Sequence, residues 1–189
     1  MEYRMHSGTN WANIITISRV VEIPIVAMLL IYGGFWCSIA AALLFIVATF
    51  SDFLDGYIAR RYHMESNLGK FLDPLADKLI VITVLIFLIP LGRAPAWIVA
   101  LIVAREIAVT GLRSIASEQN IVIAANWLGK YKTAFQCAAL IPLLMHYTIF
   151  GIQFQKGGEY FLWIATFFTV WSGIDYIYSY LRVSLADER

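Results

Sequence analysis

Six long apolar stretches constrain this chain more than any other feature of its sequence. Each is about 20 residues long, the length that an α-helix needs to cross the hydrocarbon core of a bilayer. The stretches are Ile14–Tyr32, Trp36–Leu54, Phe71–Leu91, Pro95–Ile115, Ala125–Ile149 and Tyr160–Leu181. Short breaks rich in glycine and polar residues separate them. The pattern predicts an all-α integral membrane protein with six transmembrane helices in a single domain, residues 1–189.

The composition supports this prediction. Only 14% of the residues are charged and 60% are hydrophobic, whereas a soluble globular domain carries about 25% charged residues. The two cysteines, Cys37 and Cys137, both fall inside apolar stretches. They therefore predict small buried side chains rather than a disulfide framework.

The distribution of basic residues predicts the orientation of the chain. Arginine and lysine gather at both termini and in the second and fourth loops, whereas the opposite loops carry only Arg93 and Lys156. Because positive charge accumulates on the cytoplasmic side, both termini are expected in the cytoplasm of a multi-pass cell (inner) membrane protein. Residues Met1–Ala12 are expected to lie along the membrane surface, with Trp11 as an interfacial anchor.

Four aspartates lie at the cytoplasmic ends of the second and third stretches, and carboxylates near lipid are costly. Asp52 and Asp55 are three residues apart, and Asp73 and Asp77 are four apart. Either spacing places both members of a pair on one face of a helix. Two such faces on consecutive helices would form a cage of hard oxygen ligands, suited to Mg²⁺, Mn²⁺ or Ca²⁺ rather than to zinc.

The aspartates belong to a longer pattern, D-x-x-D-G-x-x-A-R-x(8)-G-x-x-x-D-x-x-x-D. Its other positions are Gly56, Ala59, Arg60 and Gly69. Small residues allow a bulky group or another helix to approach the backbone. Taken singly, Asp73 before Pro74 would serve as a helix cap and Asp55 before Gly56 as a turn signal. Eight positions in one register favour a functional site instead.

This pattern resembles the signature of the CDP-alcohol phosphatidyltransferases, and every signature position is matched. The segment NWANIITISRVVEIP is similar to the start of the first span in that family, with Ala12 in place of the usual proline. The segments VAREIAVTGLR, WLGKYKT and FLDPLADK resemble the branch of the family that uses glycerol 3-phosphate as the acceptor. The resemblance extends over nearly the whole chain.

The resemblance implies an enzyme that transfers a phosphatidyl group from CDP-diacylglycerol to glycerol 3-phosphate and releases CMP. It implies that Asp52, Asp55 and Asp73 bind divalent cations, Mg²⁺ or Mn²⁺, two per active site. Asp77 is implied as the base and as a further metal ligand. The residues implied to contact CDP-diacylglycerol are Gly56, Ala59, Arg60, Gly69, Asn13 and Thr16. Asn13 could instead cap a helix.

A second group of residues is basic and suits the phosphate of the acceptor. It consists of Arg105, Arg113, Lys130, Lys132 and Arg19. Arg105 lies inside the fourth apolar stretch; the alternative to a functional role is an ion pair with the adjacent Glu106, whose side chain points about 100° away on a helix. Arg113 and Lys130 could be topological anchors, and Arg19 could pair with Glu22. Lys130 and Lys132 point about 200° apart, so at most one of them faces a pocket squarely.

Other functions are compatible with parts of this pattern. A relative of the same fold could use inositol phosphate or phosphatidylglycerol as the acceptor. A divalent-cation transporter would need carboxylates near the membrane midplane and on both sides, whereas these cluster at one end. The family resemblance further implies a homodimer in a lipid bilayer, and no nucleic-acid partner is expected.

Overall fold

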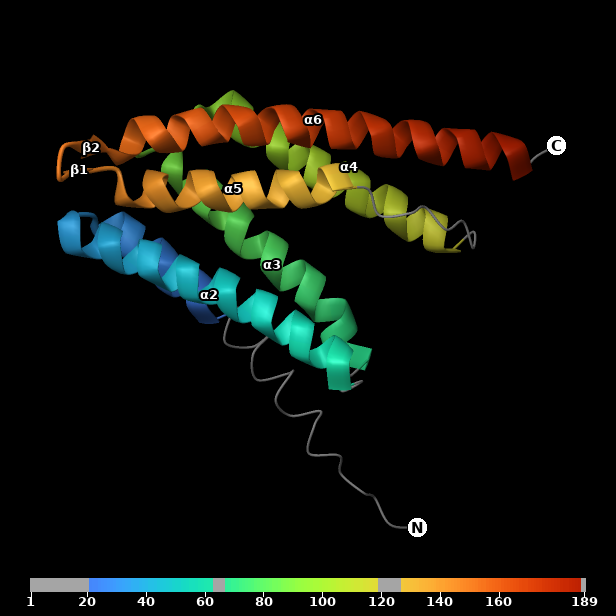
Figure 1. Cartoon of the computed structure of the whole chain (residues 1–189), viewed down its shortest axis with the longest axis horizontal. Helices are drawn as coiled ribbons and strands as arrows, with labels where there is room; N and C mark the ends of the chain where they lie inside the picture. The colour runs from blue at the N-terminus through green and yellow to red at the C-terminus, as the bar shows by residue number, and fades with distance from the viewer. Residues whose placement is uncertain (1–20, 63–66, 119–126, 188–189) are drawn as a thin grey trace, which may run out of the picture. The chain divides into compact units, whose positions relative to one another are not determined.

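Helices dominate the structure, a computed structural model that describes residues 21–62, 67–118 and 127–187, with side chains described over 21–51, 78–118 and 127–183 (Figure 1). Residues 21–32 are helical. The other helices are α2 (Phe35–Tyr62), α3 (Asn67–Leu88), α4 (Ala96–Glu118), α5 (Trp127–Met145) and α6 (Phe154–Asp187). Each predicted apolar stretch overlaps one of these helices where the structure describes it, so the all-α prediction is confirmed.

Glycine and proline end and begin the helices where the sequence predicts breaks. Gly33 and Gly34 adopt positive φ angles of 67° and 88°, and the Gly33 N–H donates to the Leu29 carbonyl at 3.1 Å. This left-handed closure of a helix favours glycine, which has no Cβ to clash. Pro95 precedes α4, and its carbonyl accepts from the N–H groups of Ile98 and Val99. Proline suits this place because its own missing N–H is not needed there.

The connection between α5 and α6 differs from the sequence prediction. The fifth helix was expected to reach Ile149 and the sixth to begin at Tyr160, and both boundaries are wrong. α5 ends at Met145, a two-stranded hairpin of β1 (Thr148–Ile149) and β2 (Ile152–Gln153) follows, and α6 begins at Phe154. Phe150 and Gly151 form the turn with φ angles of 52° and 79°. Two positive φ angles are typical of the tight turn that matches the twist of a hairpin.

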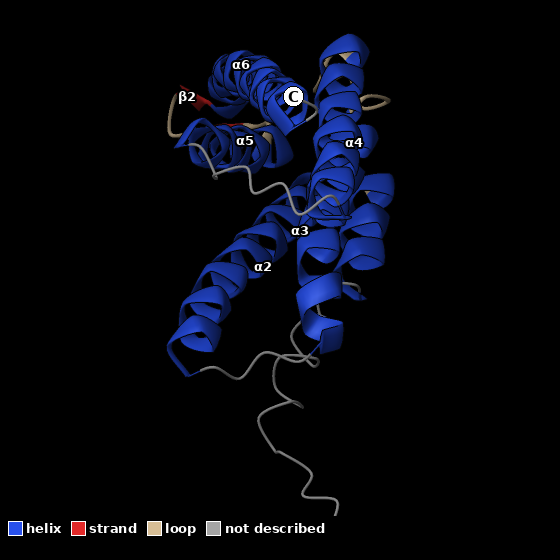
Figure 2. Ribbon diagram, turned by 90° about the vertical axis from the view of Figure 1, so that its right-hand side faces the viewer, coloured by secondary structure: helices blue, strands red, loops and turns tan. Residues whose placement is uncertain are grey.

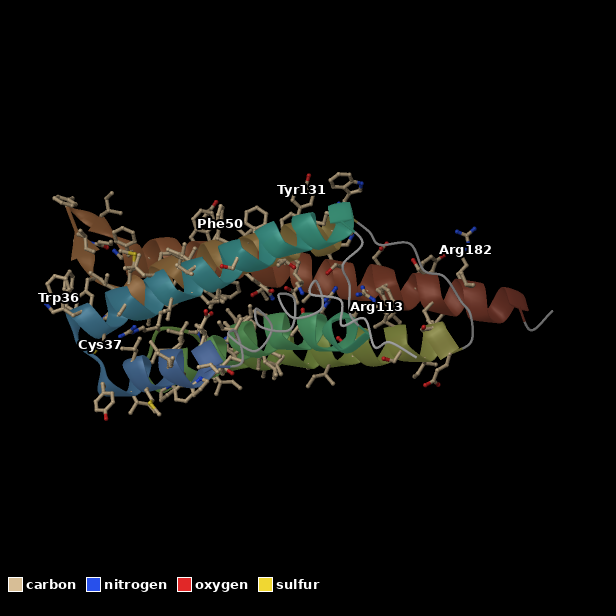
Figure 3. The ribbon with its side chains drawn as sticks, turned by 90° about the horizontal axis from the view of Figure 1, so that it is seen from below. Trp36, Cys37, Phe50, Arg113, Tyr131 and Arg182 are labelled. Atoms are coloured by element: carbon tan, nitrogen blue, oxygen red, sulfur yellow. The ribbon has the colours of Figure 1, made fainter. Side chains whose placement is uncertain are left out.

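The chain divides into two structural units, Met1–Phe87 and Leu88–Arg189. In the first unit α2 and α3 run in opposite directions (Figure 1). Among the side chains of α2 that the structure describes, the buried ones recur at helical spacing and are Ser38, Ala41, Ala42, Phe45 and Ala48. Its other faces carry exposed apolar side chains, among them Trp36 and Phe50 (Figure 3).

The second unit contains α4, α5 and α6. α5 and α6 pack along their length, and α4 also contacts α6 (Figure 2). The apolar core of this unit includes Ile98, Ile102, Leu140, Leu143, Leu162 and Ala165. Gly158 allows close packing of α5 and α6, because a Cβ at this position would lie 2.6 Å from Leu143 Cγ.

The surface of α6 is rich in large apolar side chains. Its exposed members include Trp163, Phe167, Trp171, Ile174 and Tyr178. Among the residues that the structure describes, none of the helices is both long and apolar enough to cross a membrane. The predicted location of the helices relative to a membrane stays a prediction.

Candidate functional site: an acidic motif on two helices and a buried cationic cluster

The acidic motif lies on two consecutive helices, as the sequence predicts. Asp52 and Asp55 belong to α2, and Asp73 and Asp77 belong to α3. Because both segments are helical, the spacing of each pair places its two positions on one side of a helix. A donor set made only of carboxylates fits Mg²⁺ or Mn²⁺. On this count the residues fit the implied metal.

The side chains of the motif lie outside the described residues, so their convergence stays a prediction. This also applies to Gly56, Ala59, Arg60 and Gly69, and to Asn13, Thr16 and Arg19. Among the side chains that are described, no group of three or more histidine, cysteine, aspartate or glutamate residues could hold a metal ion.

In the second unit, Glu106 joins two of the predicted basic residues. Arg105 Nη1 donates to Glu106 Oε1 at 3.1 Å, and Lys132 Nζ on α5 donates to the same oxygen. Arg105 Nη2 donates to Ser172 Oγ on α6 at 2.9 Å. The pairing of Arg105 with its neighbour, left open by the sequence, therefore exists, and Lys132 shares it. These contacts connect α4 to α5 through an ion pair and to α6 through a hydrogen bond.

We call Arg105, Glu106, Lys132, Gln136 and Ser172 the Glu106 cluster. Four of them are almost fully buried, the most exposed being Lys132 at 7%. One carboxylate faces two cations, so the cluster carries one excess positive charge. Two buried N–H donors, Arg105 Nε and Gln136 Nε2, have no hydrogen-bond partner among the residues that the structure describes. Buried donors without an acceptor are costly, so an anionic ligand would stabilise this arrangement.

The fold makes room for the cluster. On α4 the buried side chains are apolar at Ile98 and Ile102 and become polar at Glu106. On α5 and α6 as well, buried polar side chains (Lys132 and Gln136; Thr169 and Ser172) lie next to buried apolar ones. A Cβ on Gly173 would lie 3.0 Å from Arg105 Cγ, so the glycine of α6 accommodates the arginine stem. Sequence reasoning missed Glu106 as the centre of the cluster. Its signal was a carboxylate in the middle of an apolar stretch.

Arg113 and Lys130 lie apart from the Glu106 cluster, and both are exposed. The Arg113 guanidinium points from α4 towards α6, with its carbon 5.7 Å from the centroid of the Tyr176 ring (Figure 3). Lys130 Nζ lies 4.4 Å from the centroid of Trp127. Cation–π contacts of this kind contribute modestly at exposed sites. The structure thus separates these basic residues into an exposed pair, Arg113 and Lys130, and a pair that contacts Glu106, the buried Lys132 and the partly buried Arg105.

Comparison with known proteins identifies the family. The family model described as CDP-alcohol phosphatidyltransferase matches residues 9–171. This chain belongs to the CDP-alcohol phosphatidyltransferase family. The resemblance that the acidic motif indicates is therefore confirmed, and the match extends from residue 9 into α6, well beyond the motif.

Curated members of the family are similar along most of their length. The CDP-diacylglycerol–glycerol-3-phosphate 3-phosphatidyltransferase of Bacillus subtilis is 42% identical over 179 residues, which cover 88% of this chain and 93% of that protein. The protein of the same name from Rickettsia prowazekii is 37% identical over 173 residues, covering 91% and 96%. CDP-diacylglycerol–glycerol-3-phosphate 3-phosphatidyltransferase 2 of Arabidopsis thaliana is 35% identical over 187 residues, covering 91% and 80%.

Proposed function

We propose that this chain transfers the phosphatidyl group of CDP-diacylglycerol to glycerol 3-phosphate, producing phosphatidylglycerophosphate and CMP. The observation that carries the proposal is the similarity to curated relatives with this activity in their names, at 42% identity over 88% of the chain for one of them. The complete acidic motif on α2 and α3 supports the reaction type. The Glu106 cluster, with its unpaired donors, supports an anionic acceptor.

The acidic motif supplies the chemistry at phosphorus. Asp52, Asp55, Asp73 and Asp77 would hold two divalent cations, Mg²⁺ or Mn²⁺, which neutralise charge on the attacking and leaving oxygens when bound. Asp77 accepts the proton of the acceptor hydroxyl. The hydroxyl oxygen forms a bond to the β-phosphorus of CDP-diacylglycerol, the bond from that phosphorus to the bridging oxygen breaks, and CMP leaves with that oxygen.

The rest of the motif binds the lipid donor. Gly56 and Ala59 leave space for the cytidine ring, and Arg60 pairs with the diphosphate. Gly69 allows close approach to the backbone. Asn13 and Thr16 contact the nucleotide from the first span.

The basic residues of α4 and α5 bind the phosphate of the acceptor. Arg105 and Lys132 supply charge, and the unpaired N–H groups of Arg105 and Gln136 supply donors. Glu106 acts as a positioning residue, because it holds both cations in place. We assign further contacts with the phosphate to Arg113, Lys130 and Arg19. A free phosphate monoester carries more charge than the diester of a second lipid, so this surplus favours a small phosphorylated acceptor.

We place the protein in the cell (inner) membrane as a multi-pass homodimer, with both termini and the active site facing the cytoplasm. Support comes from the 60% hydrophobic composition and from the exposed apolar side chains of α2 and α6. A lipid donor suits this location, because its acyl chains can stay in the bilayer while its head group reacts. The opposite charge bias of alternate loops supports the orientation.

The test is CMP release from CDP-diacylglycerol by the purified protein with a panel of acceptors: glycerol 3-phosphate, inositol phosphate, serine and phosphatidylglycerol. Release should require glycerol 3-phosphate and Mg²⁺ or Mn²⁺, and should stop in chelator. Preference for inositol phosphate or phosphatidylglycerol would assign the chain to another branch of the family. Metal uptake into liposomes without CMP release would indicate a transporter instead.

A further inference from the structure

A second polar site lies at the opposite end of the second unit from Arg113. A cavity of about 390 Å³ is bordered by the turn before α4 and by the first turns of α6. Glu106 lies 10 residues into α4, about 15 Å along the helix from its start, and Arg113 lies 17 residues in, about 26 Å from the start. The cavity is large enough for a small ligand. It is therefore separate from the Glu106 cluster and from the proposed acceptor site.

Two opposite charges face this cavity without touching each other. Arg93 and Glu159 both line it, yet these two described residues form no ion pair with each other. Arg93 is only 8% exposed, and its Nη1 donates to the Leu144 carbonyl at 3.1 Å. Burial lowers the pKa of Arg93, and Tyr147 partly opposes this shift. An arginine nevertheless keeps its proton at neutral pH, so the cavity holds a fixed positive charge.

Gln155 holds both sides of the cavity in place. Its Nε2 donates to the Arg93 carbonyl at 3.2 Å and to Glu159 Oε1 at 2.6 Å. Its Oε1 is buried and accepts no hydrogen bond from any described residue. The Glu159 side of the cavity therefore has acceptors in excess, whereas the Arg93 side presents a cation.

Aromatic and aliphatic side chains complete the rim. Trp163 borders the cavity and packs edge-on against Trp97, with ring centroids 5.3 Å apart. Both indoles are more than half exposed, at 55% and 54%. Exposed tryptophans gather at the level of lipid head groups in membrane proteins. An indole face also attracts a cation.

We propose that this cavity binds the head group of a zwitterionic phospholipid that carries a phosphodiester and a primary ammonium, as in phosphatidylethanolamine. Arg93 pairs with the phosphate, since a guanidinium can donate two parallel hydrogen bonds to phosphate oxygens. Glu159 and the Trp163 ring bind the ammonium. A primary ammonium fits better than a quaternary one because it can donate hydrogen bonds to the carboxylate. The proposal rests on the proposed membrane location but not on the transferase reaction.

The experiment measures lipid retention. The purified wild-type protein is equilibrated in micelles containing equal amounts of phosphatidylethanolamine, phosphatidylcholine and phosphatidylglycerol with identical acyl chains, and retained lipid is counted by native mass spectrometry. We expect at least fivefold preference for phosphatidylethanolamine over either other lipid. Soluble phosphoethanolamine in excess should displace the retained lipid. Equal retention of the three lipids, or no displacement, would overturn the proposal.

Variants locate the site. Glu159→Gln changes an exposed side chain and should abolish the preference for phosphatidylethanolamine over phosphatidylglycerol while transferase activity stays unchanged. Lys156→Gln, an exposed charge nearby on α6 that does not line the cavity, is the matched control and should retain the preference. Arg93→Gln should lower retention of all three lipids. Full preference in Glu159→Gln refutes the inference even if Arg93→Gln fails to fold.

Failure of this inference differs from failure of the proposed function. A wild-type protein that sediments with membranes and releases CMP, but shows no head-group preference, refutes the cavity proposal alone. A protein absent from the membrane fraction refutes the location on which the proposal depends.

Discussion

Replacing Glu106 by glutamine should destabilise the protein strongly. Glu106 is 6% exposed and accepts from both Arg105 and Lys132. The substitution removes the negative charge that contacts both the buried Lys132 and the partly buried Arg105. Breaking a buried ion pair by removing one partner costs about 3–5 kcal/mol. Because the amide oxygen of glutamine keeps the shape and one acceptor, we expect the lower end, about 3 kcal/mol.

The effect can be measured as a shift of thermal unfolding. For a chain of this size 1 kcal/mol corresponds to about 2–4 °C, so Glu106→Gln should lower Tm by about 6–12 °C. Tryptophan fluorescence in detergent follows unfolding, since the chain contains six tryptophans. The matched control is Glu118→Gln, an exposed carboxylate at the end of α4, which should shift Tm by no more than about 1 °C.

Added anion should partly restore the variant. Inorganic phosphate or glycerol 3-phosphate can take the place of the missing carboxylate between the two cations, so either should raise the Tm of Glu106→Gln more than that of the wild type. A sodium chloride control at equal ionic strength separates specific binding from screening. A Tm decrease below 2 °C, or equal stabilisation of both proteins by phosphate, would contradict the role assigned to the cluster.

Three further substitutions test the remaining roles. Asp77→Asn should retain substrate binding but lose most turnover because the amide cannot accept the proton; a near wild-type rate would exclude it as the base. Arg113→Ala should raise KM for glycerol 3-phosphate at least tenfold, with a smaller change for CDP-diacylglycerol, since a hydrogen bond to a charged group contributes about 1.5–3 kcal/mol; an unchanged KM would make it a topological anchor. Gly173→Ala should destabilise by about 1–3 kcal/mol in chemical unfolding because its Cβ meets Arg105 Cγ at 3.0 Å. Gly111→Ala is its control, with no atom within 4 Å, and equal effects at both glycines would contradict the packing argument.

The helices were predictable from the sequence because their signal is local. Runs of about 20 apolar residues specify a helix wherever they occur, and glycine or proline marks the breaks. The predicted helix ends at Ile149 and Tyr160 were wrong because a β-hairpin connects α5 to α6. The hairpin turn at Phe150 and Gly151 depends on backbone angles that hydrophobicity does not reveal.

The sequence alone determined the family and the acidic motif, since eight motif positions in one register identify both without coordinates, and the family match confirms the first. The tertiary structure decided which charges meet. Lys132 lies 26 residues from Glu106, and Ser172 lies 67 residues from Arg105, yet helix packing places all four together. It also placed Arg93 and Glu159 on one cavity. Such contacts depend on how three helices face one another, and a periodic pattern defines the buried face of each helix but not its partner.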